Sequence, residues 1–330
     1  MAEYDLLDNF DYELDDSGIA QTPVEPRDSA KMLTFSAGQI MHKQVKDLVD
    51  ELVEGDVLVV NDTKVRPARF HLQKSSGGSV EVLLLKPTGK YLEWTALVKP
   101  SKRVAVGSVL EFNGQPILEV GEVVEEQRVV RLLDEGFIDS VGEIPLPPYI
   151  KQKLQNSDRY QTVYANRVGS AAAPTAGLHL STRLLKELKN KGVDIQTVDL
   201  EVGLGTFKPI ATKNVADHAI HTETYRVSQE SWDKIRSAKR VIACGTTVVR
   251  TLETVAKTNN LEGSTALFIK RDFDWQVVDR LLTNFHVPKS SLLVLVDAFI
   301  GSAWKDIYLE AKLNDYRFLS LGDCMLLDRM

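Results

Sequence analysis

The stretch Asp56-Val-Leu-Val-Val-Asn-Asp-Thr-Lys64 joins a run of four branched apolar residues to a polar segment. An apolar run of this length, preceded by Gly55, predicts a short buried strand, and the polar residues after it predict a loop. Loops at the ends of parallel strands are a common place for function. Apolar residues recur at helical spacing between Gln39 and Leu52, which predicts a helix before the strand.

The pattern changes after the polar loop. From about Val65 to Val141, short β-branched runs are separated by Gly, Pro and Asn, which is typical of a small barrel or sandwich. The expected strands cover residues 79–85, 92–98, 108–112, 117–124 and 128–133. Pro145-Leu-Pro-Pro148 predicts an extended link out of this region.

Alternating helix and strand patterns return after Arg159. Helices are expected at 182–191, 229–239 and 246–258, strands at 195–202, 240–244, 265–269 and 276–282, and residues 292–299 close the apolar series. The expected fold class is therefore α/β: a discontinuous α/β domain of residues 1–64 and 156–330, with residues 65–155 inserted as a small β-barrel domain.

The composition is that of a globular protein. The chain has 330 residues, 43% hydrophobic and 26% charged, which is enough for two domains with sizeable cores. The first 20 residues are acidic and lack the basic and apolar parts of a signal peptide, and no run of 18 uncharged apolar residues occurs, so a cytoplasmic protein without membrane contact is expected. The spacing of Cys244 and Cys324 indicates neither a disulfide framework nor a zinc site.

Charge is unevenly distributed along the chain. The net charge is −6, but residues 1–30 carry −8 and the remaining 300 residues carry +2. Residues 64–110 hold nine Lys or Arg against two Glu, and residues 111–143 hold nine acids against two Arg. A basic stretch beside an acidic one fits a protein that orients a phosphate backbone, whereas the alternative is an ordinary solvated β surface.

Two small-residue segments are candidates for ligand contact. Ala171-Ala-Ala-Pro-Thr-Ala-Gly-Leu-His179 precedes the helix expected at Thr182, where free N–H groups could receive an anion; the alternative is tight packing, with His179 near the helix cap. Val202-Gly-Leu-Gly-Thr-Phe207 resembles the start of a nucleotide-binding turn. The third glycine is absent and Pro209 follows, so neither a dinucleotide fold nor the usual methyltransferase fold is supported.

Three further segments carry polar side chains. In His218-Ala-Ile-His221-Thr-Glu223, two histidines would share a face of a helix and could hold a metal, orient a base or form a structural cluster; without a further ligand, no metal is expected. Gly245-Thr-Thr-Val-Val-Arg250 begins a helix, with Thr246 or Thr247 as a possible N-cap. Thr283-Asn-Phe-His286 ends an apolar strand, and its aromatic ring could stack on a base or fill a core.

Taken together, these segments resemble the S-adenosylmethionine:tRNA ribosyltransferase-isomerase family of queuosine biosynthesis nearly from end to end. The resemblance rests on Phe10-Asp-Tyr12, Pro26-Arg-Asp28, Asn61-Asp-Thr-Lys64 with Pro67-Ala-Arg69, Pro145-Leu-Pro-Pro-Tyr149, Tyr160-Gln-Thr-Val-Tyr164, Ala172-Ala-Pro-Thr-Ala-Gly-Leu-His179, Gly203 to Phe207, His218 with His221 and Glu223, Gly245-Thr-Thr247 with Arg250, Thr283-Asn-Phe-His286, and Tyr316-Arg-Phe318 with Gly322-Asp323.

The resemblance implies an α/β domain with an inserted β-barrel and an enzyme acting on tRNA. S-Adenosylmethionine would be the co-substrate, donating its ribosyl group to 7-aminomethyl-7-deazaguanine at the wobble position. The product would be epoxyqueuosine-tRNA, with adenine and methionine released. A monomer without a metal is expected.

The same resemblance implies roles for individual residues. The sulfonium acidifies the adjacent ribose carbon, and the candidates for the base that takes this proton are His179, His221 and His286. Arg250 or Arg317 could hold the methionine carboxylate, Tyr160, Tyr164 or Phe285 could stack on a base, and residues 64–110 could meet tRNA phosphates. The residues expected to bind substrate are Asn61, Lys64, Arg69, Tyr160, Gln161, Tyr164, Thr175, Gly177, Gly203, Gly205, Thr206, His218, Glu223, Thr246, Thr247, Arg250, Asn284, Phe285, Arg317 and Asp323.

Several positions depart from the family pattern, and they keep two alternatives open. The departures are Lys31, Arg66, Glu201, Arg271-Asp272 and Leu321. Glu201 puts an anion near the Gly-x-Gly turn, where the family commonly carries histidine. One alternative is a diverged enzyme that cleaves S-adenosylmethionine or transfers its ribosyl group to a small amine, and the other is a non-catalytic tRNA-binding relative.

Overall fold

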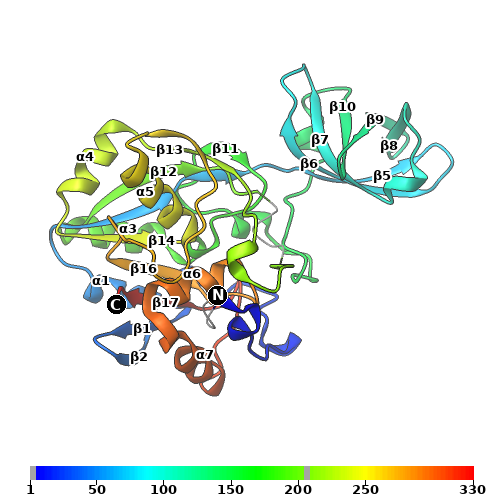
Figure 1. Cartoon of the computed structure of the whole chain (residues 1–330). Coiled ribbons are helices and arrows are strands. Elements are labelled where there is room, and N and C mark those ends of the chain that lie inside the picture. Colours follow the sequence, from blue (N-terminus) through cyan, green and yellow to red (C-terminus); the bar gives the residue numbers. More distant parts are fainter. Residues whose placement is uncertain (1–4, 204–208) are drawn as a thin grey trace. The chain divides into compact units, whose positions relative to one another are not determined.

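The chain forms two compact units in this computed structural model, which describes residues 5–203 and 209–330 (Figure 1). The first unit contains residues 1–64 and 147–330, and the second contains residues 65–146. The second unit is thus an insertion in the sequence of the first. No helix among the described residues combines the length and apolar character needed to cross a membrane.

A mixed sheet of nine strands organises the first unit. Its strand order is β15-β13-β12-β3-β14-β16-β17-β1-β2. Strands β12, β3, β14 and β16 are mutually parallel, and the outer strands make the sheet mixed. The bounds, in that order, are Glu262–Thr265, Glu223–Arg226, Asp194–Leu200, Asp56–Asn61, Arg240–Cys244, Arg280–Asn284, Cys324–Asp328, Lys31–Ser36 and Gln39–Gln44.

Strand β3 lies inside this sheet, and every one of its residues is buried. The strand expected at residues 57–60 is therefore confirmed. Val57 and Val59 belong to one hydrophobic cluster, and Leu58 and Val60 belong to another. Because successive side chains of a strand point to opposite faces, the sheet has a core on each side.

Helices cover both cores. They are α1 (Leu48–Glu51), α3 (Thr182–Asn190), α4 (Gln229–Ser237), α5 (Thr246–Thr258), α6 (Ser291–Ile300) and α7 (Trp304–Leu313). Ser181, Ser228 and Ser290 cap α3, α4 and α6 by accepting a backbone N–H three residues later, which satisfies a donor that the helix itself cannot pair. The apolar run at 292–299 is thus a helix.

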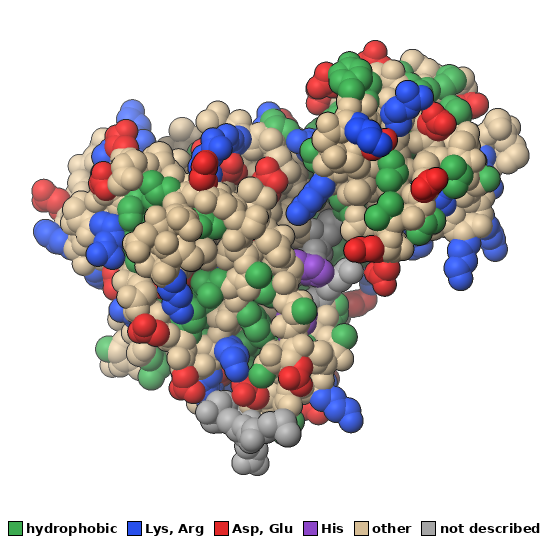
Figure 2. Space-filling view, turned by 45° about the horizontal axis from the view of Figure 1, so that its top comes forward, with side chains coloured by type: hydrophobic (Ala, Val, Ile, Leu, Met, Phe, Trp, Pro, Cys, Tyr) green, Lys and Arg blue, Asp and Glu red, His purple; other side chains and the backbone are tan. Residues whose placement is uncertain are grey.

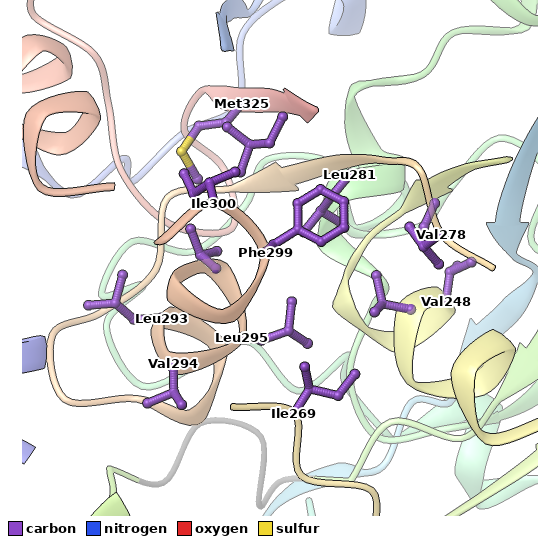
Figure 3. Close-up of a cluster of buried hydrophobic side chains, with 14 of the residues drawn as sticks. Val248, Ile269, Val278, Leu281, Leu293, Val294, Leu295, Phe299, Ile300 and Met325 are labelled. Carbon is purple, nitrogen blue, oxygen red and sulfur yellow. The ribbon is translucent and has the colours of Figure 1, made fainter. Parts of the chain in front are cut away.

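Helix α6 contributes heavily to the larger core. Figure 3 shows its Phe299 beside Leu281 of β16, and Leu295 facing the side where Val248 of α5 lies. Phe299 and Val248 are both almost fully buried. Burial of side chains of this size contributes about 1.5–3 kcal/mol each. The packing of Phe299 and Val248 in one core therefore holds α5 and α6 against β16.

The second unit contains a closed barrel with the order β10-β7-β6-β5-β8-β9. The strands from β5 to β10 cover Arg69–Lys74, Ser79–Pro87, Glu93–Lys99, Ser108–Phe112, Gln115–Val124 and Gln127–Leu132. Phe70 and Leu72 are buried while the residues between and beside them are not, which is the alternation expected of a barrel wall. The prediction of an α/β fold with an inserted small β-barrel is confirmed.

Three short elements complete the described α-helices and strands. Strands β4 (Thr63–Val65) and β11 (Arg167–Ser170) form a two-stranded sheet, and α2 (Phe137–Ser140) is one helical turn. Strand β4 coincides with the segment that the sequence predicts as a loop after β3. The polar residues there continue as an extended strand because β11 is available to pair with them.

The helix expected from Gln39 to Leu52 is wrong. Residues 39–44 form β2, which pairs antiparallel with β1, and α1 retains only four residues. Ala37 and Gly38 have φ angles of 49° and 77°, which make the tight turn of a hairpin. The pairing with β1 overrides the local helical spacing. Strands β1, β5, β11, β13 and β17 were also missed.

Two other expected strands are displaced. The run at 276–282 becomes a strand only from Arg280, because the N–H groups of Gln276, Val277 and Val278 donate to the carboxylate of Glu253 instead of to a neighbouring strand. The strand expected at 265–269 lies at Glu262–Thr265. The Thr265 hydroxyl accepts the Leu267 N–H, which turns the chain out of the sheet.

Candidate functional site

A pocket opens in the first unit where loops follow the parallel strands β14 and β16. We call it the central pocket. The described residues that line it include none of Lys, Arg, Asp or Glu. They are Tyr149, Ala173, Pro174, Thr175, Ala176, Val202, Gly245, Thr246, Thr247, Thr283, Asn284, Phe285, His286, Val287, Leu292, Leu319 and Ser320. Four of the segments singled out in the sequence therefore meet here.

The turn from β14 into α5 forms one wall. Gly245 has a φ of 96°, which residues with a side chain rarely adopt, and it occupies the N-cap position without making a side-chain cap. The expected N-cap role of Thr246 or Thr247 is therefore wrong, because both are already helical. Asn61, at the end of β3, donates its amide N–H to the Thr247 hydroxyl over 3.5 Å.

The loop after β16 brings His286 to the pocket. The Thr283 hydroxyl lies 3.0 Å from its Nε2 atom. Its backbone N–H donates to the Tyr308 hydroxyl over 3.0 Å, and its carbonyl oxygen accepts the Tyr12 hydroxyl. Burial lowers the pKa of His286 to about 3, because charging the ring would cost solvation energy. The ring is therefore neutral near pH 7.

Asn284 connects the central pocket to His179. Its Nδ2 donates to His179 Nε2 over 2.9 Å and to the Leu319 carbonyl over 3.3 Å, and its Oδ1 accepts the Thr175 hydroxyl over 3.0 Å. Because the carbonyl of Leu319 can only accept, the orientation of the Asn284 amide is fixed. Nε2 of His179 is therefore an acceptor, and the neutral ring carries its proton on Nδ1.

His179 borders a smaller neighbouring cavity together with Arg27, Arg159 and Leu321. Its pKa is lowered to about 4, mainly by burial and further by the positive charges of Arg317, Arg159 and Arg27. His179 and His286 thus lie on either side of the Thr283-Asn284 segment. Each ring bonds to one residue of that segment, and the two rings line different cavities.

The segment around His218 and His221 forms a second pocket with Arg250. The helical arrangement considered for these histidines is wrong: the chain is extended between a short 3-10 turn ending at Asp217 and strand β13. Burial, and then the neighbouring His221, lower the pKa of His218. Leu292 lines both this pocket and the central one, so the two are adjacent.

Arg250 and Glu223 form a buried ion pair in this second pocket. Arg250 also donates to the backbone carbonyls of Leu267 at 3.1 Å, His221 at 3.3 Å and Thr265 at 3.4 Å. Glu223 additionally accepts the Gly203 N–H over 3.1 Å. Four of the five N–H groups of Arg250 are therefore engaged within the protein.

The expected stacking aromatics have different surroundings. The Tyr160 and Phe285 side chains are completely buried, and Phe285 packs against the rings of Tyr308, Tyr316 and Phe318. Gly177 passes close to Tyr164, since a Cβ at Gly177 would lie 2.0 Å from the Tyr164 hydroxyl oxygen. The Tyr164 ring therefore packs closely against the backbone at Gly177.

Other expected site residues lie away from the central pocket. Asp323 accepts the backbone N–H groups of Lys31 at 2.8 Å and Arg317 at 2.7 Å, and so orders the loop before β17. The backbone carbonyl of Gln161 accepts Arg27. Lys64 is exposed on β4, and Arg69 belongs to the barrel unit, where it donates to the Leu146 carbonyl. Gly205 and Thr206 lie outside the described residues.

Tyr149 and Ser320 are polar lining residues that were missed as site candidates. Tyr149 and Ser320 share a hydrogen bond of 2.5 Å, and burial raises the pKa of Tyr149 to about 12. Tyr149 stands in a quoted motif as the end of a proline-rich link, which gave no hint of its position. Ser320 follows Leu319, whose φ of 70° turns the chain toward the pocket. No sequence pattern marked that turn.

Four of the departures have structural partners. Arg271 forms a bidentate ion pair with Asp297, at 2.6 and 3.1 Å, while the Arg66 guanidinium lies 4.5 Å from the Trp94 ring centre. Leu321 is buried beside His179, and Glu201 is exposed over Gly169. None of the four lines the central pocket.

Comparison with known proteins places these features in a family. The model of the family described as queuosine biosynthesis protein matches residues 7–327. The chain is 47% identical to the S-adenosylmethionine:tRNA ribosyltransferase-isomerase of Carboxydothermus hydrogenoformans and 45% identical to that of Staphylococcus aureus. Each of these alignments covers 97% of this chain and 99% of the relative. The crystal structure of S-adenosylmethionine tRNA ribosyltransferase from Thermotoga maritima is 33% identical, with a TM-score of 0.56 over 97% of this chain and 99% of that one.

Proposed function

Because this chain belongs to the S-adenosylmethionine:tRNA ribosyltransferase-isomerase family of queuosine biosynthesis, we propose that its central pocket is the site of that reaction. The enzyme uses S-adenosylmethionine to form epoxyqueuosine in tRNA. The observation that carries the site assignment is the convergence of the family's separated motifs, those containing Thr175, Thr246, Asn284 and His286, on one pocket. The acceptor is 7-aminomethyl-7-deazaguanine at the wobble position, and the enzyme acts where tRNA is found, in the cytoplasm.

His286 is the proton acceptor of this proposal. Of the three candidate histidines, it alone is among the described residues of the central pocket. Its Nδ1 atom has no partner among the described residues, whereas the Nε2 acceptor of His179 is occupied by Asn284. Since the sulfonium acidifies the neighbouring ribose carbon, a neutral imidazole beside that carbon would take the proton.

Tyr149 is the complementary proton donor. Adenine is a poor leaving group as an anion, so a nearby O–H would help its departure. Burial keeps the Tyr149 hydroxyl protonated and the His286 ring unprotonated near pH 7, which separates the two into donor and acceptor. A pKa of about 3 makes His286 a weak base in the free enzyme. The proton transfer therefore depends on the acidity that the sulfonium gives to the neighbouring ribose carbon.

Asn284 and His179 serve as positioning residues. The chain of bonds from Thr175 through Asn284 to His179 fixes the end of β16 beside His286. His179 acts here through its contact with Asn284 and takes no proton from substrate.

The test is release of adenine from S-adenosylmethionine, with and without tRNA carrying the deazaguanine base. Wild-type protein should release adenine and methionine only with that tRNA. His286→Gln should lower kcat by about a hundredfold or more while the protein stays folded, the range usual for loss of a general base. His221→Gln, in the second pocket, is the matched comparison. Wild-type turnover by His286→Gln would end the assignment of the base, and adenine release without tRNA would favour a small-molecule acceptor.

A further inference from the structure

We propose that the start of α5 is an oxyanion site that binds the carboxylate of the methionyl part of S-adenosylmethionine. This inference rests on the proposed function of the central pocket and goes beyond it by fixing which end of the substrate lies against Thr246 and Thr247.

The first observation is a helix N-terminus without a cap. Helix α5 has 13 residues, and no side chain caps it. The N–H of Gly245 donates to Leu282, and the first helical bond is from Val249 to Gly245. The N–H groups of Thr246, Thr247 and Val248 have no acceptor in the described part of the chain. The partial positive charge of the helix dipole lies at these three donors, where an anion is stabilised.

The second observation is independent of the helix. The Thr246 side chain is only 7% exposed, lines the central pocket, and has no hydrogen-bond partner among residues 5–203 and 209–330. The hydroxyl oxygen of this mostly buried residue is open to the pocket, and a polar atom in such a place is normally paired with water or a ligand. Its position in the pocket wall indicates that a bound ligand supplies the partner.

The neighbouring hydroxyl is prepared in the same way. Oδ1 of Asn61 accepts the N–H groups of Thr63 and Leu200, so the Asn61 amide is fixed with its Nδ2 donating to Thr247. The Thr247 oxygen is thus already an acceptor, which leaves its proton free to donate. The two threonines thus line the pocket, and the three N–H groups of the first helical turn lie beside them.

Charge decides what those donors bind. The described lining residues carry no cationic side chain, so the α5 terminus is the electropositive part of the pocket wall. Arg250, the alternative carboxylate ligand considered from the sequence, is already paired with Glu223 in the adjacent pocket. S-Adenosylmethionine has one carboxylate, and its adenosine part has no anionic group. A tRNA phosphate is the other oxyanion that could occupy the site.

The experiment compares two ligands that differ in the carboxylate. Calorimetry should give dissociation constants for S-adenosylmethionine and for decarboxylated S-adenosylmethionine, which keeps the sulfonium nucleoside. Thr246→Asp places a competing carboxylate on the helix terminus. It should weaken binding of S-adenosylmethionine by about a hundredfold and change binding of the decarboxylated ligand by less than about threefold. Thr246→Asn introduces a side chain of the same size as aspartate but without charge. It should weaken binding of S-adenosylmethionine by about tenfold.

Two controls separate structure from binding. An acidic residue in the first turn stabilises a helix, so Thr246→Asp should not lower the melting temperature even though it blocks the ligand. Thr258→Val, at the opposite end of α5, should leave both dissociation constants unchanged, because its hydroxyl bonds to Thr254 and Asn260 at the C-terminal end of the helix.

The possible outcomes are distinct. If Thr246→Asp weakens the binding of both ligands equally, or the binding of neither, the carboxylate assignment is overturned. A raised KM for tRNA with an unchanged dissociation constant for S-adenosylmethionine, together with competition between inorganic phosphate and tRNA, would overturn it in favour of a phosphate. If the expected pattern of binding appears but adenine is not released, the inference stands and the proposed function fails.

Discussion

The Nε2 atom of His179 accepts a hydrogen bond of 2.9 Å from the side-chain amide of Asn284. The two residues lie 105 positions apart in the sequence, and the bond joins the segment before α3 to the end of β16. Because the amide also donates to the Leu319 carbonyl, it cannot be turned around without facing two carbonyl oxygens toward each other. The bond therefore determines where the His179 proton lies.

This relationship predicts the NMR behaviour of His179. The ring should be the Nδ1-protonated tautomer at pH 7 and should titrate near pH 4, well below an exposed histidine. Asn284→Asp replaces the donating amide by a carboxylate, which favours the imidazolium and raises that pKa. Nitrogen-detected spectra over a pH series would measure both. Titration of wild-type His179 near pH 6.5 would contradict the burial on which the argument depends.

A second prediction concerns Tyr308, one of the two tyrosines that bond to the backbone of His286. Tyr308→Phe removes the acceptor of the His286 N–H and leaves a buried donor unpaired, at a cost of about 1–3 kcal/mol in the free energy of unfolding. Because the ring of His286 would lose its fixed position, kcat should fall more than KM rises. Tyr91→Phe, on an 82% exposed side chain of the barrel, is the control and should change neither. A rise in KM without a fall in kcat would mean that the Tyr308 contact supports substrate binding instead.

The ion pair of Arg250 and Glu223 predicts a loss of stability more than of affinity. Arg250→Met removes the positive charge beside the buried Glu223 carboxylate, so it should destabilise the first unit by about 3–5 kcal/mol. The double replacement Arg250→Met and Glu223→Leu should recover part of that loss, because no isolated charge remains. Urea unfolding would measure both. An Arg250→Met protein of normal stability with a strongly raised KM for S-adenosylmethionine would show instead that Arg250 binds substrate.

The low histidine pKa values predict how stability depends on pH. His286 has a folded-state pKa of about 3 against about 6.5 when unfolded, so between these values the unfolded chain binds more protons. Its contribution to stability is complete above pH 6.5 and is lost as the pH falls toward 3. The difference in unfolding free energy between pH 7 and pH 5 should therefore be smaller for His286→Gln than for wild type, by about 2 kcal/mol.

The control for that measurement is Gln73→Ala, on an exposed side chain of β5 that does not titrate. The free energy of unfolding of this variant should depend on pH as that of wild type does. Carboxylates that titrate in the same range are common to all three proteins, so the comparison isolates the buried ring. Equal slopes for wild type and His286→Gln would contradict the lowered pKa.

Local patterns in the sequence predict much of the fold. Strand β14 and helix α5 begin and end where their patterns indicate, since each is a continuous buried or amphipathic run. The hairpin of β1 and β2 was missed because its pairing overrides the helical spacing after Gln39. A pattern within one segment does not report a partner from another.

In the candidate site, too, the sequence indicated individual segments but not the contacts between them. The motifs containing Thr175, Asn284 and His286 were recognised as segments, but their meeting in one pocket depends on the order of strands in the sheet. The hydroxyl of Thr246 suggested an N-cap, whereas Gly245 takes that position because its φ of 96° suits glycine. The contact of Tyr12 with His286 joins residues 274 positions apart, which no local pattern could indicate.

Charge in the barrel unit gives the last prediction, which concerns tRNA. In the barrel, strands β7, β6, β5 and β8, which carry most of the basic stretch, lie next to one another, and β9 and β10 of the acidic stretch complete the ring. On the face seen in Figure 2, Lys and Arg side chains of the barrel lie among Asp and Glu. Lys99 and Lys102 are exposed, and neither forms an ion pair with a described residue.

If this surface meets tRNA phosphates, the double variant Lys99→Glu and Lys102→Glu should bind tRNA more weakly and lower the slope of log Kd against log salt by about 2. Binding of S-adenosylmethionine should not change, because the central pocket is formed by residues of the other unit. An unchanged salt slope for tRNA would exclude these two lysines from the phosphate contact and return the basic stretch to an ordinary solvated surface.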